Sequence, residues 1–203
     1  MVPKSSIYHH HSIRLKNYDY SQSGAYFVTI CTHNREFLFC EIVNCKIVLN
    51  EKGKMVEKWW YELNNKFTNI ETDLYVVMPN HFHGILVINN PPVEADIRVC
   101  TDNITDQSKG EHTGSALHKI VQWFKTMTTN DYIKNVKTKN WAPFDKKLWQ
   151  RNYYEHIIRN EIELNRVREY IMNNPLKWEL DFENPERKKE YKNFTDYLKV
   201  HIL

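Results

Sequence analysis

The sequence predicts an α+β fold: a ferredoxin-like antiparallel sheet in the order βαββαβ with helices on one face, followed by a C-terminal helix that bears a tyrosine. Three observations predict it. Short runs of β-branched and aromatic residues alternate with longer segments whose apolar residues recur at helical spacing. Two strand-like runs are separated only by Pro79-Asn80, which predicts a tight connection. The last periodic segment stops before Pro175, as a helix would.

The first elements are a strand, a hairpin and a helix. Tyr26–Thr32 is rich in β-branched and aromatic residues and predicts the first strand. Phe37–Phe39 and Lys46–Leu49 flank a polar turn, so we expect them to pair as a hairpin. Asn50 is a favourable N-cap for the helix behind it. The apolar face of this helix is formed by Val56, Trp59, Trp60, Leu63 and Phe67.

The remaining elements complete the predicted order. Leu74–Met78 and His81–Ile88 are apolar runs that predict two adjacent strands. Ser115 is the expected N-cap of the second helix, and Leu148–Ile158 is the expected fourth strand. Asn160 is the expected start of the last helix. The buried stripe of the second helix is formed by Leu117, Ile120, Val121, Phe124 and Met127. The apolar face of the last helix is formed by Leu164, Val167 and Ile171.

The length and composition predict one catalytic domain with extensions. The chain has 203 residues, of which 41% are hydrophobic and 26% charged, an ordinary globular composition. We expect an N-terminal extension at 1–23, the domain at 24–180 and a surface insertion at 89–114. The tail 181–203 is charged and is predicted to form a solvated helix. Its apolar residues at helical spacing are Tyr191, Phe194 and Leu198.

The sequence also predicts a cytoplasmic location. No apolar run approaches the length of a membrane span, and residues 1–16 lack the apolar core of a secretory signal. The 4 cysteines form no Cys-x-x-Cys pair, which favours reduced thiols over a disulfide framework or a zinc site. The formal net charge of +3 is compatible with a nucleic-acid partner but does not by itself indicate one.

The first chemical signal is His81-Phe82-His83. On a strand, residues i and i+2 point to the same face, so both imidazoles can reach one cation while Phe82 points to the opposite face. Taken alone, the pattern also fits two unrelated histidines on a strand.

The second signal is Tyr170 followed by Asn174. Residues four apart lie one above the other on a helix. The Asn174 carbonyl oxygen is a suitable hard ligand for Mg²⁺ or Mn²⁺, and it would place a metal beside the Tyr170 hydroxyl. Taken alone, the pair also fits an amphipathic tyrosine and an asparagine that ends a helix.

Together the two signals predict phosphoryl transfer. If the last helix packs on the histidine strand, His81, His83 and Asn174 surround one metal and Tyr170 lies beside it. A metal at such a site polarises a phosphate and neutralises the charge of the transition state. A tyrosine attack forms a covalent ester that a free 3′-hydroxyl can later reverse, whereas hydrolysis needs no such link.

At these residues the sequence resembles a known family, the REP-associated tyrosine transposases, a branch of the single-tyrosine HUH transposases. His81-Phe82-His83 lies within Met78–Ile88 and is similar to the histidine–hydrophobe–histidine signature, and Tyr170–Pro175 resembles the tyrosine motif. Further similar stretches are Ser12–Leu15 with Tyr18–Tyr20, Gly24–Thr32, and Leu148–Arg159. The resemblance covers roughly residues 12–180, with 89–114 unmatched.

The resemblance implies a DNA nicking and joining enzyme. Tyr170 is expected to attack single-stranded DNA, to form a 5′-phosphotyrosine and to free a 3′-hydroxyl, with Mg²⁺ or Mn²⁺ held by His81, His83 and Asn174. The implied substrates are short palindromic repeats folded as hairpins, and the protein would be nucleoid-associated when bound to them. The minimal insertion-sequence relatives use glutamine where this chain has Asn174, so asparagine favours the REP-associated branch. The resemblance leaves monomer and homodimer both open.

Several further residues are candidates for lesser roles. Tyr153 and Tyr154 are rival nucleophiles, and His156 is a candidate for an additional ligand or proton carrier. On a strand, Tyr154 and His156 would share a face and could both lie near the metal. Candidate contacts to DNA, through charge or through ring stacking, are Arg14, Lys125, Trp149, Arg151, Tyr153, Tyr154, His156 and Arg159.

Two other functions fit the same residues. One is a hairpin DNA-binding module that has lost transposition, and the other is a metal-dependent phosphodiesterase that uses water. The first predicts binding without cleavage, and the second predicts hydrolysed ends without a protein–DNA adduct.

Overall fold

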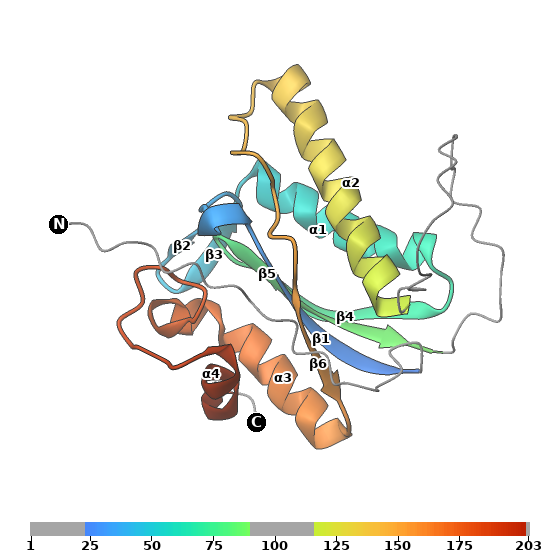
Figure 1. Cartoon of the computed structure of the whole chain (residues 1–203), viewed down its shortest axis with the longest axis vertical. Helices are drawn as coiled ribbons and strands as arrows, with labels where there is room; N and C mark the ends of the chain where they lie inside the picture. Colours follow the sequence, from blue (N-terminus) through green and yellow to red (C-terminus); the bar gives the residue numbers. More distant parts are fainter. Residues whose placement is uncertain (1–22, 90–115, 202–203) are drawn as a thin grey trace, which may run out of the picture.

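The computed structural model describes residues 23–89 and 116–201. Their main feature is a four-stranded antiparallel sheet whose strands lie in the order β4-β5-β1-β6 (Figure 1). The strands are β1 (Gly24–Cys31), β4 (Ile70–Val77), β5 (His81–Ile88) and β6 (Tyr154–Ile158). With α1 (Glu51–Lys66) after β1 and α2 (Ala116–Lys139) after β5, the chain has the predicted βαββαβ order. The ferredoxin-like fold class is confirmed.

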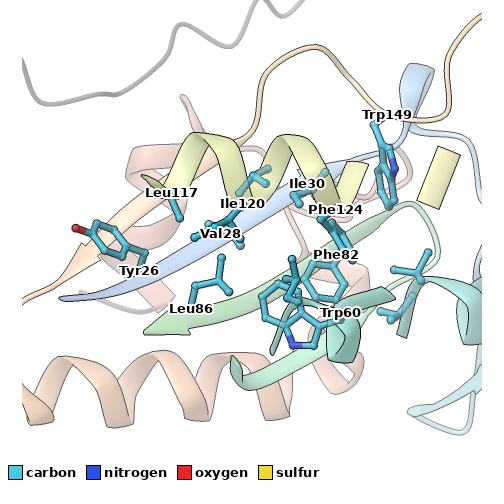
Figure 2. Packing of buried hydrophobic residues seen from close by; sticks show 14 of the residues in the cluster. Tyr26, Val28, Ile30, Trp60, Phe82, Leu86, Leu117, Ile120, Phe124 and Trp149 are labelled. Atoms are coloured by element: carbon cyan, nitrogen blue, oxygen red, sulfur yellow. The ribbon is translucent and has the colours of Figure 1, made fainter. Parts of the chain in front are cut away.

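Helices α1 and α2 pack on one face of the sheet (Figure 1). Figure 2 shows the core between them and the strands, in which Trp60 of α1 and Phe124 of α2 meet Phe82 of β5. Trp60 can lie this close only because residue 84 is glycine, since a Cβ there would be 2.7 Å from the indole ring. Phe82 therefore points into this core, as the strand alternation predicts.

Helix α3 (Glu161–Asn173) covers the opposite face of the sheet. Its Val167, Tyr170 and Ile171 are buried against Phe27 and Ile85 of the central strands. Figure 1 shows α3 on the side of the sheet away from α1 and α2. The tyrosine-bearing helix thus lies over the face that the two histidines of β5 share.

The residues after α3 are not a solvated tail. They form a 3₁₀ segment, η2 (Pro175–Leu180), and a short helix, α4 (Phe194–His201). Phe182, Tyr197 and Leu198 are buried with Tyr170 in the core beneath α3. The prediction of a solvated helix was wrong, because the high charge of the segment concealed a few apolar residues that are buried against the residues beneath α3.

The hairpin pairs β2 (Cys40–Val43) with β3 (Lys46–Leu49), not Phe37–Phe39 with Lys46–Leu49. Asn44 and Cys45 have φ of 51° and 60°, so they form a two-residue turn that pairs Val43 with Lys46. A turn of this kind fixes the register. Phe37 lies outside the hairpin, between the short 3₁₀ segment η1 (His33–Arg35) and β2, and is exposed.

The predicted strand Leu148–Ile158 begins only at Tyr154. Its first half leaves the sheet after an isolated bridge between Thr32 and Trp149. The Trp149 side chain is drawn into the core instead, where its indole N–H donates to Thr128 Oγ1 at 2.8 Å. The predicted N-cap Ser115 lies outside the described residues, as do the predicted extension 1–23 and insertion 89–114 except for residues 23 and 89.

Two smaller predictions concern the same part of the chain. Cys31, Cys40 and Cys45 are free thiols, whereas Cys100 is outside the described residues. None of the helices that the structure describes is both long enough and apolar enough to cross a membrane.

Candidate metal and tyrosine site

His81 and His83 form the centre of the candidate site. Both side chains are fully buried on the face of β5 that α3 covers, and their Nε2 atoms are 3.0 Å apart. The convergence follows from the strand period, because residues 81 and 83 share a face. Two imidazoles whose Nε2 atoms converge in this way can supply two ligands to one metal ion.

Each outward-facing Nδ1 atom is held by a neighbouring polar group. His81 Nδ1 lies 2.9 Å from Asn80 Oδ1, which can only accept, so Nδ1 carries the proton and Nε2 a lone pair. His83 Nδ1 lies 2.8 Å from Thr29 Oγ1 on the paired strand β1. Because a hydroxyl can donate or accept, the bond to Thr29 is compatible with both tautomers of His83, the one with a proton on Nε2 and the one with a lone pair there. Such partners orient metal-binding histidines in proteins.

Burial keeps both imidazoles neutral. Burial, with the positive charge of Arg35 as a lesser cause, lowers the pKa of His81 to about 3. Burial and the neighbouring His81 lower the pKa of His83 well below its usual value, although Asp181 opposes this. A neutral imidazole is the form that coordinates a metal.

Asp181 is a third group at the site, and the sequence interpretation missed it. His81, His83 and Asp181 each offer a ligand atom, these atoms lie within 4.8 Å of one another, and all three residues are buried. The group could hold a metal ion. Asp181 follows the irregular segment η2, so no helical or strand spacing relates it to the histidines.

Asn174, the predicted third ligand, lies beside Asp181. Its Nδ2 donates to Asp181 Oδ2 at 3.0 Å, which ties the end of α3 to the group. Its Oδ1 is buried and has no hydrogen-bond partner among the described residues. A buried acceptor without a partner is costly, and a cation would satisfy it.

The Tyr170 hydroxyl is at the same place. It lies 3.2 Å from His83 Nε2 and donates to the Tyr197 hydroxyl at 3.2 Å, which in turn donates to Asp181 Oδ2 at 3.2 Å. Burial, and then the charge of Asp181, raises the pKa of Tyr170. The hydroxyl is therefore a neutral phenol here, which must lose its proton to act as a nucleophile.

The structure thus brings both Tyr170 and His81 into contact with His83 and joins Asn174 to the group through Asp181. The predicted packing of the last helix on the histidine strand is confirmed by these contacts. Tyr197 is a second tyrosine at the site that the sequence interpretation did not select.

The other candidates lie around this centre. His156 Nε2 is 2.7 Å from Glu163 Oε1 at the start of α3, and His156 does not belong to the group that could hold a metal. Tyr154 pairs with Thr29 across β1 and β6 and packs its ring edge against Phe27. Tyr154 therefore lies near His83 through Thr29, whereas His156 is directed toward α3.

The candidate DNA contacts differ in their availability. Lys125 Nζ donates to the carbonyl oxygens of Gln150 and Arg151 at 2.6 and 3.0 Å, so it holds the chain before β6. Trp149 is 4% exposed and is not available for stacking on a base, which corrects that prediction. Arg151 and Arg159 are exposed, Tyr153 is half-buried, and Arg14 lies outside the described residues.

The lowered pKa values of the histidines predict an acid-sensitive fold. In the unfolded chain each histidine titrates near its ordinary pKa of 6.5, whereas in the folded chain that of His81 is about 3. Between these values the unfolded chain binds more protons, so stability is present above pH 6.5 and is lost as pH falls. In EDTA, we expect the free energy of unfolding to fall by about 1.4 kcal/mol per pH unit for each histidine.

Urea unfolding at several pH values from about pH 7 to about pH 5 measures this loss. The variant His83→Gln keeps a side chain that can hydrogen-bond but does not titrate, so its pH slope should be about half as steep. A wild-type stability that does not change over this range would contradict the prediction.

Comparisons with known proteins give a sequence relative and several distant structural likenesses. No protein-family model matches the chain. A Haemophilus influenzae protein described as uncharacterized is 40% identical over 177 residues, which cover 87% of this chain and 94% of that protein.

Among solved structures, a REP-associated tyrosine transposase bound to a REP hairpin has a TM-score of 0.47 at 18% identity, covering 77% of this chain and 69% of its own. A candidate transposase of Deinococcus radiodurans has a TM-score of 0.43 at 13% identity, covering 79% of this chain and 95% of its own. Both likenesses are too distant to transfer an activity.

Proposed function

The chain belongs to the same family as the uncharacterized Haemophilus influenzae protein, and we propose that its function is metal-dependent cleavage and joining of single-stranded DNA through Tyr170. The observation that carries the proposal is the 3.2 Å contact between the Tyr170 hydroxyl and His83 Nε2, inside a buried group that could hold a metal. A nucleophile beside such a group is the arrangement that phosphoryl transfer requires.

The sequence motifs support the same reaction. His81-Phe82-His83 resembles the HUH signature, and Tyr170–Pro175 resembles the tyrosine motif of single-tyrosine transposases. The two motifs are 87 residues apart in the chain, yet their side chains meet. A shared role in one reaction explains this contact better than chance packing does, since the atoms that meet are a nucleophilic hydroxyl and a metal-binding nitrogen.

The residues present fit a divalent cation. His81 and His83 are neutral, and the Asp181 carboxylate and the unpartnered Asn174 Oδ1 add oxygen ligands of the kind that Mg²⁺ and Mn²⁺ prefer. When bound, the ion would polarise a phosphodiester and stabilise the charge that develops on it. We assign His81 and His83 as ligands, with Asp181 and Asn174 as the candidates for the third position.

The proposed step balances as a transesterification. Tyr170 Oη attacks the phosphorus, the P–O3′ bond breaks, and the tyrosine becomes linked to the 5′-phosphate, while the 3′-oxygen leaves and takes up one proton from solvent to become a hydroxyl. The phenol proton must be removed, and Tyr197 with Asp181 is the hydrogen-bonded path that leads away from Tyr170. Because Tyr170 is 4% exposed, the substrate must also displace the residues that cover the hydroxyl.

The decisive experiment incubates the purified chain with Mn²⁺ and a single-stranded DNA hairpin that is labelled on either side of the cut. A labelled protein band on a denaturing gel, with a free 3′-hydroxyl on the other fragment, supports the proposal. Free 5′- and 3′-ends without an adduct would indicate the water-using phosphodiesterase. Binding without cleavage in Mg²⁺ or Mn²⁺ would indicate a DNA-binding module. Size measurement of the adduct would show whether a monomer or a homodimer carries it.

A further inference from the structure

A groove of about 770 Å³ runs between α2 and the segment 144–153 that leads into β6. Its far wall includes Gln150, Asn152 and Tyr153, and its near wall is the polar side of α2. The proposed reaction does not use this groove, and the groove is several times too large for the single phosphate that Tyr170 would attack.

The groove is lined by cations and by no acid. Lys125, Lys146, Lys147 and Arg151 line it, and none of its described lining residues is Asp or Glu. The chain as a whole has 28 Lys and Arg against 25 Asp and Glu, so the groove departs from the average composition. A concave surface lined with one sign of charge attracts a polyanion.

Three of the four cations are available to a ligand. Lys146, Lys147 and Arg151 are exposed, and they form no ion pair within the part of the chain that the structure describes. Lys125 instead holds the Gln150 and Arg151 carbonyl oxygens, which fixes the course of the far wall. The backbone that forms the far wall of the groove is therefore held in place by a side chain of α2.

The groove borders a small cavity beside the tyrosine site. A cavity of about 20 Å³ shares Gln150, Asn152 and Tyr153 with the groove and is also lined by Thr29, Tyr154 and Glu183. Thr29 Oγ1 is the atom that holds His83 Nδ1 at 2.8 Å. The far wall of the groove thus adjoins residues that flank the histidine pair, so a strand bound in the groove would lie close to the tyrosine site.

An aromatic surface lies at this junction. The Tyr153 ring is stacked on His118 of α2, with ring centroids 6.2 Å apart and an interplanar angle of 24°. Tyr153 is half-buried, so part of its side chain is open to the groove. Unpaired bases stack on aromatic faces, whereas bases inside a duplex are not available to do so.

We propose that this groove binds the unpaired DNA strand next to the phosphate that Tyr170 attacks, with Lys146, Lys147 and Arg151 on its phosphates and Tyr153 beneath a base. The inference rests on the proposed function for its direction toward Tyr170. Its charge and shape are independent of that function.

The test compares two double variants that remove the same charge. Lys146→Gly/Lys147→Gln removes two cations from the groove, and glycine accepts the left-handed backbone of residue 146, whose φ is 57°. Lys46→Gln/Lys66→Gln removes two exposed cations on β3 and α1, away from the groove. Fluorescence anisotropy with a labelled single-stranded oligonucleotide, over a series of KCl concentrations, gives the affinity and its salt dependence.

Two lost phosphate contacts should reduce the slope of log K against log[salt] by about 1.4 and weaken binding about 25-fold near 0.1 M salt. The control should change neither by a comparable amount. Equal losses in both variants, or an unchanged slope in the groove variant, would overturn the proposal. An equal loss of affinity for a blunt duplex would overturn the assignment to an unpaired strand.

Failure of the groove and failure of the proposed function give different results. A wild-type adduct together with normal binding by the groove variant rejects the groove and keeps the reaction. A reduced salt slope without any wild-type adduct keeps the groove as a DNA-binding surface and rejects the reaction. Circular dichroism and thermal unfolding of both variants confirm that a loss of binding is not a loss of fold.

Discussion

The variant Tyr170→Phe should form no protein–DNA adduct and should cut hairpin DNA at least about 10³-fold more slowly than the wild type, because the attacking oxygen is gone. The ring itself is buried against Phe27 and can stay there as phenylalanine. The variant loses its hydrogen bonds to His83 and Tyr197, which should cost about 1 kcal/mol of stability or slightly more. Adduct formation on a denaturing gel and the rate of cutting measure the two effects.

The matched control is Tyr197→Phe, which removes a buried hydroxyl 3.2 Å from that of Tyr170. It should lower the rate but keep the adduct, since Tyr170 remains. Mass spectrometry of the crosslinked peptide identifies the linked residue. An adduct that persists in Tyr170→Phe, on Tyr197 or on Tyr154, would remove Tyr170 from its proposed role.

The sequence predicted the parts of this site that follow a regular period. His81 and His83 share a face because a strand alternates, and Tyr170 and Asn174 share a face because a helix repeats nearly every four residues. The packing of α3 on β5 could be inferred only by assuming that the two signals belong to one site. The sheet order followed in the same way from alternating strand and helix patterns.

The missed features depend on irregular backbone and on distant contacts. Asp181 reaches the histidines through the 3₁₀ segment η2, and no periodicity predicts where such a segment turns. The hairpin register depends on the positive φ of Asn44 and Cys45, although neither residue is glycine. Trp149 looked like a strand residue, and it is in the core because Thr128 of α2 accepts its N–H.

The same contacts show why the C-terminal segment belongs to the site. Tyr197 and Asp181 bond to Tyr170 and Asn174, which are the two residues selected from α3. A domain boundary at 180 would therefore cut through the hydrogen-bond network around the proposed nucleophile. We propose that the catalytic unit extends at least to α4.

Metal binding should stabilise the wild-type chain strongly. An ion that binds only the folded state contributes about 2.7 kcal/mol at a concentration 100 times its Kd, which raises the Tm of a chain of this size by roughly 5 to 10 °C. We expect this shift with Mn²⁺ in thermal unfolding, and we expect EDTA to reverse it. A wild-type Tm that does not respond to Mn²⁺ or Mg²⁺ would contradict the assignment of the site.

The variants His81→Ala and His83→Ala should each abolish the shift, because each removes one of the two imidazoles that meet at 3.0 Å. His156→Ala is the matched control, and its shift should equal that of the wild type, since His156 bonds to Glu163 and lies outside the group.

Two further variants decide the third ligand. If Asp181 coordinates the ion, Asp181→Asn should lower the metal affinity about 10- to 100-fold or more, while Asn174→Ala lowers it less. If the unpartnered Asn174 Oδ1 coordinates it, the order is reversed. Equal, small effects of both variants would mean that the third ligand is neither residue. Both variants disturb the contact between Asn174 and Asp181, and Asp181→Asn in addition removes the charge that accepts from the Tyr197 hydroxyl, so the metal affinity is compared with the adduct yield of Tyr197→Phe.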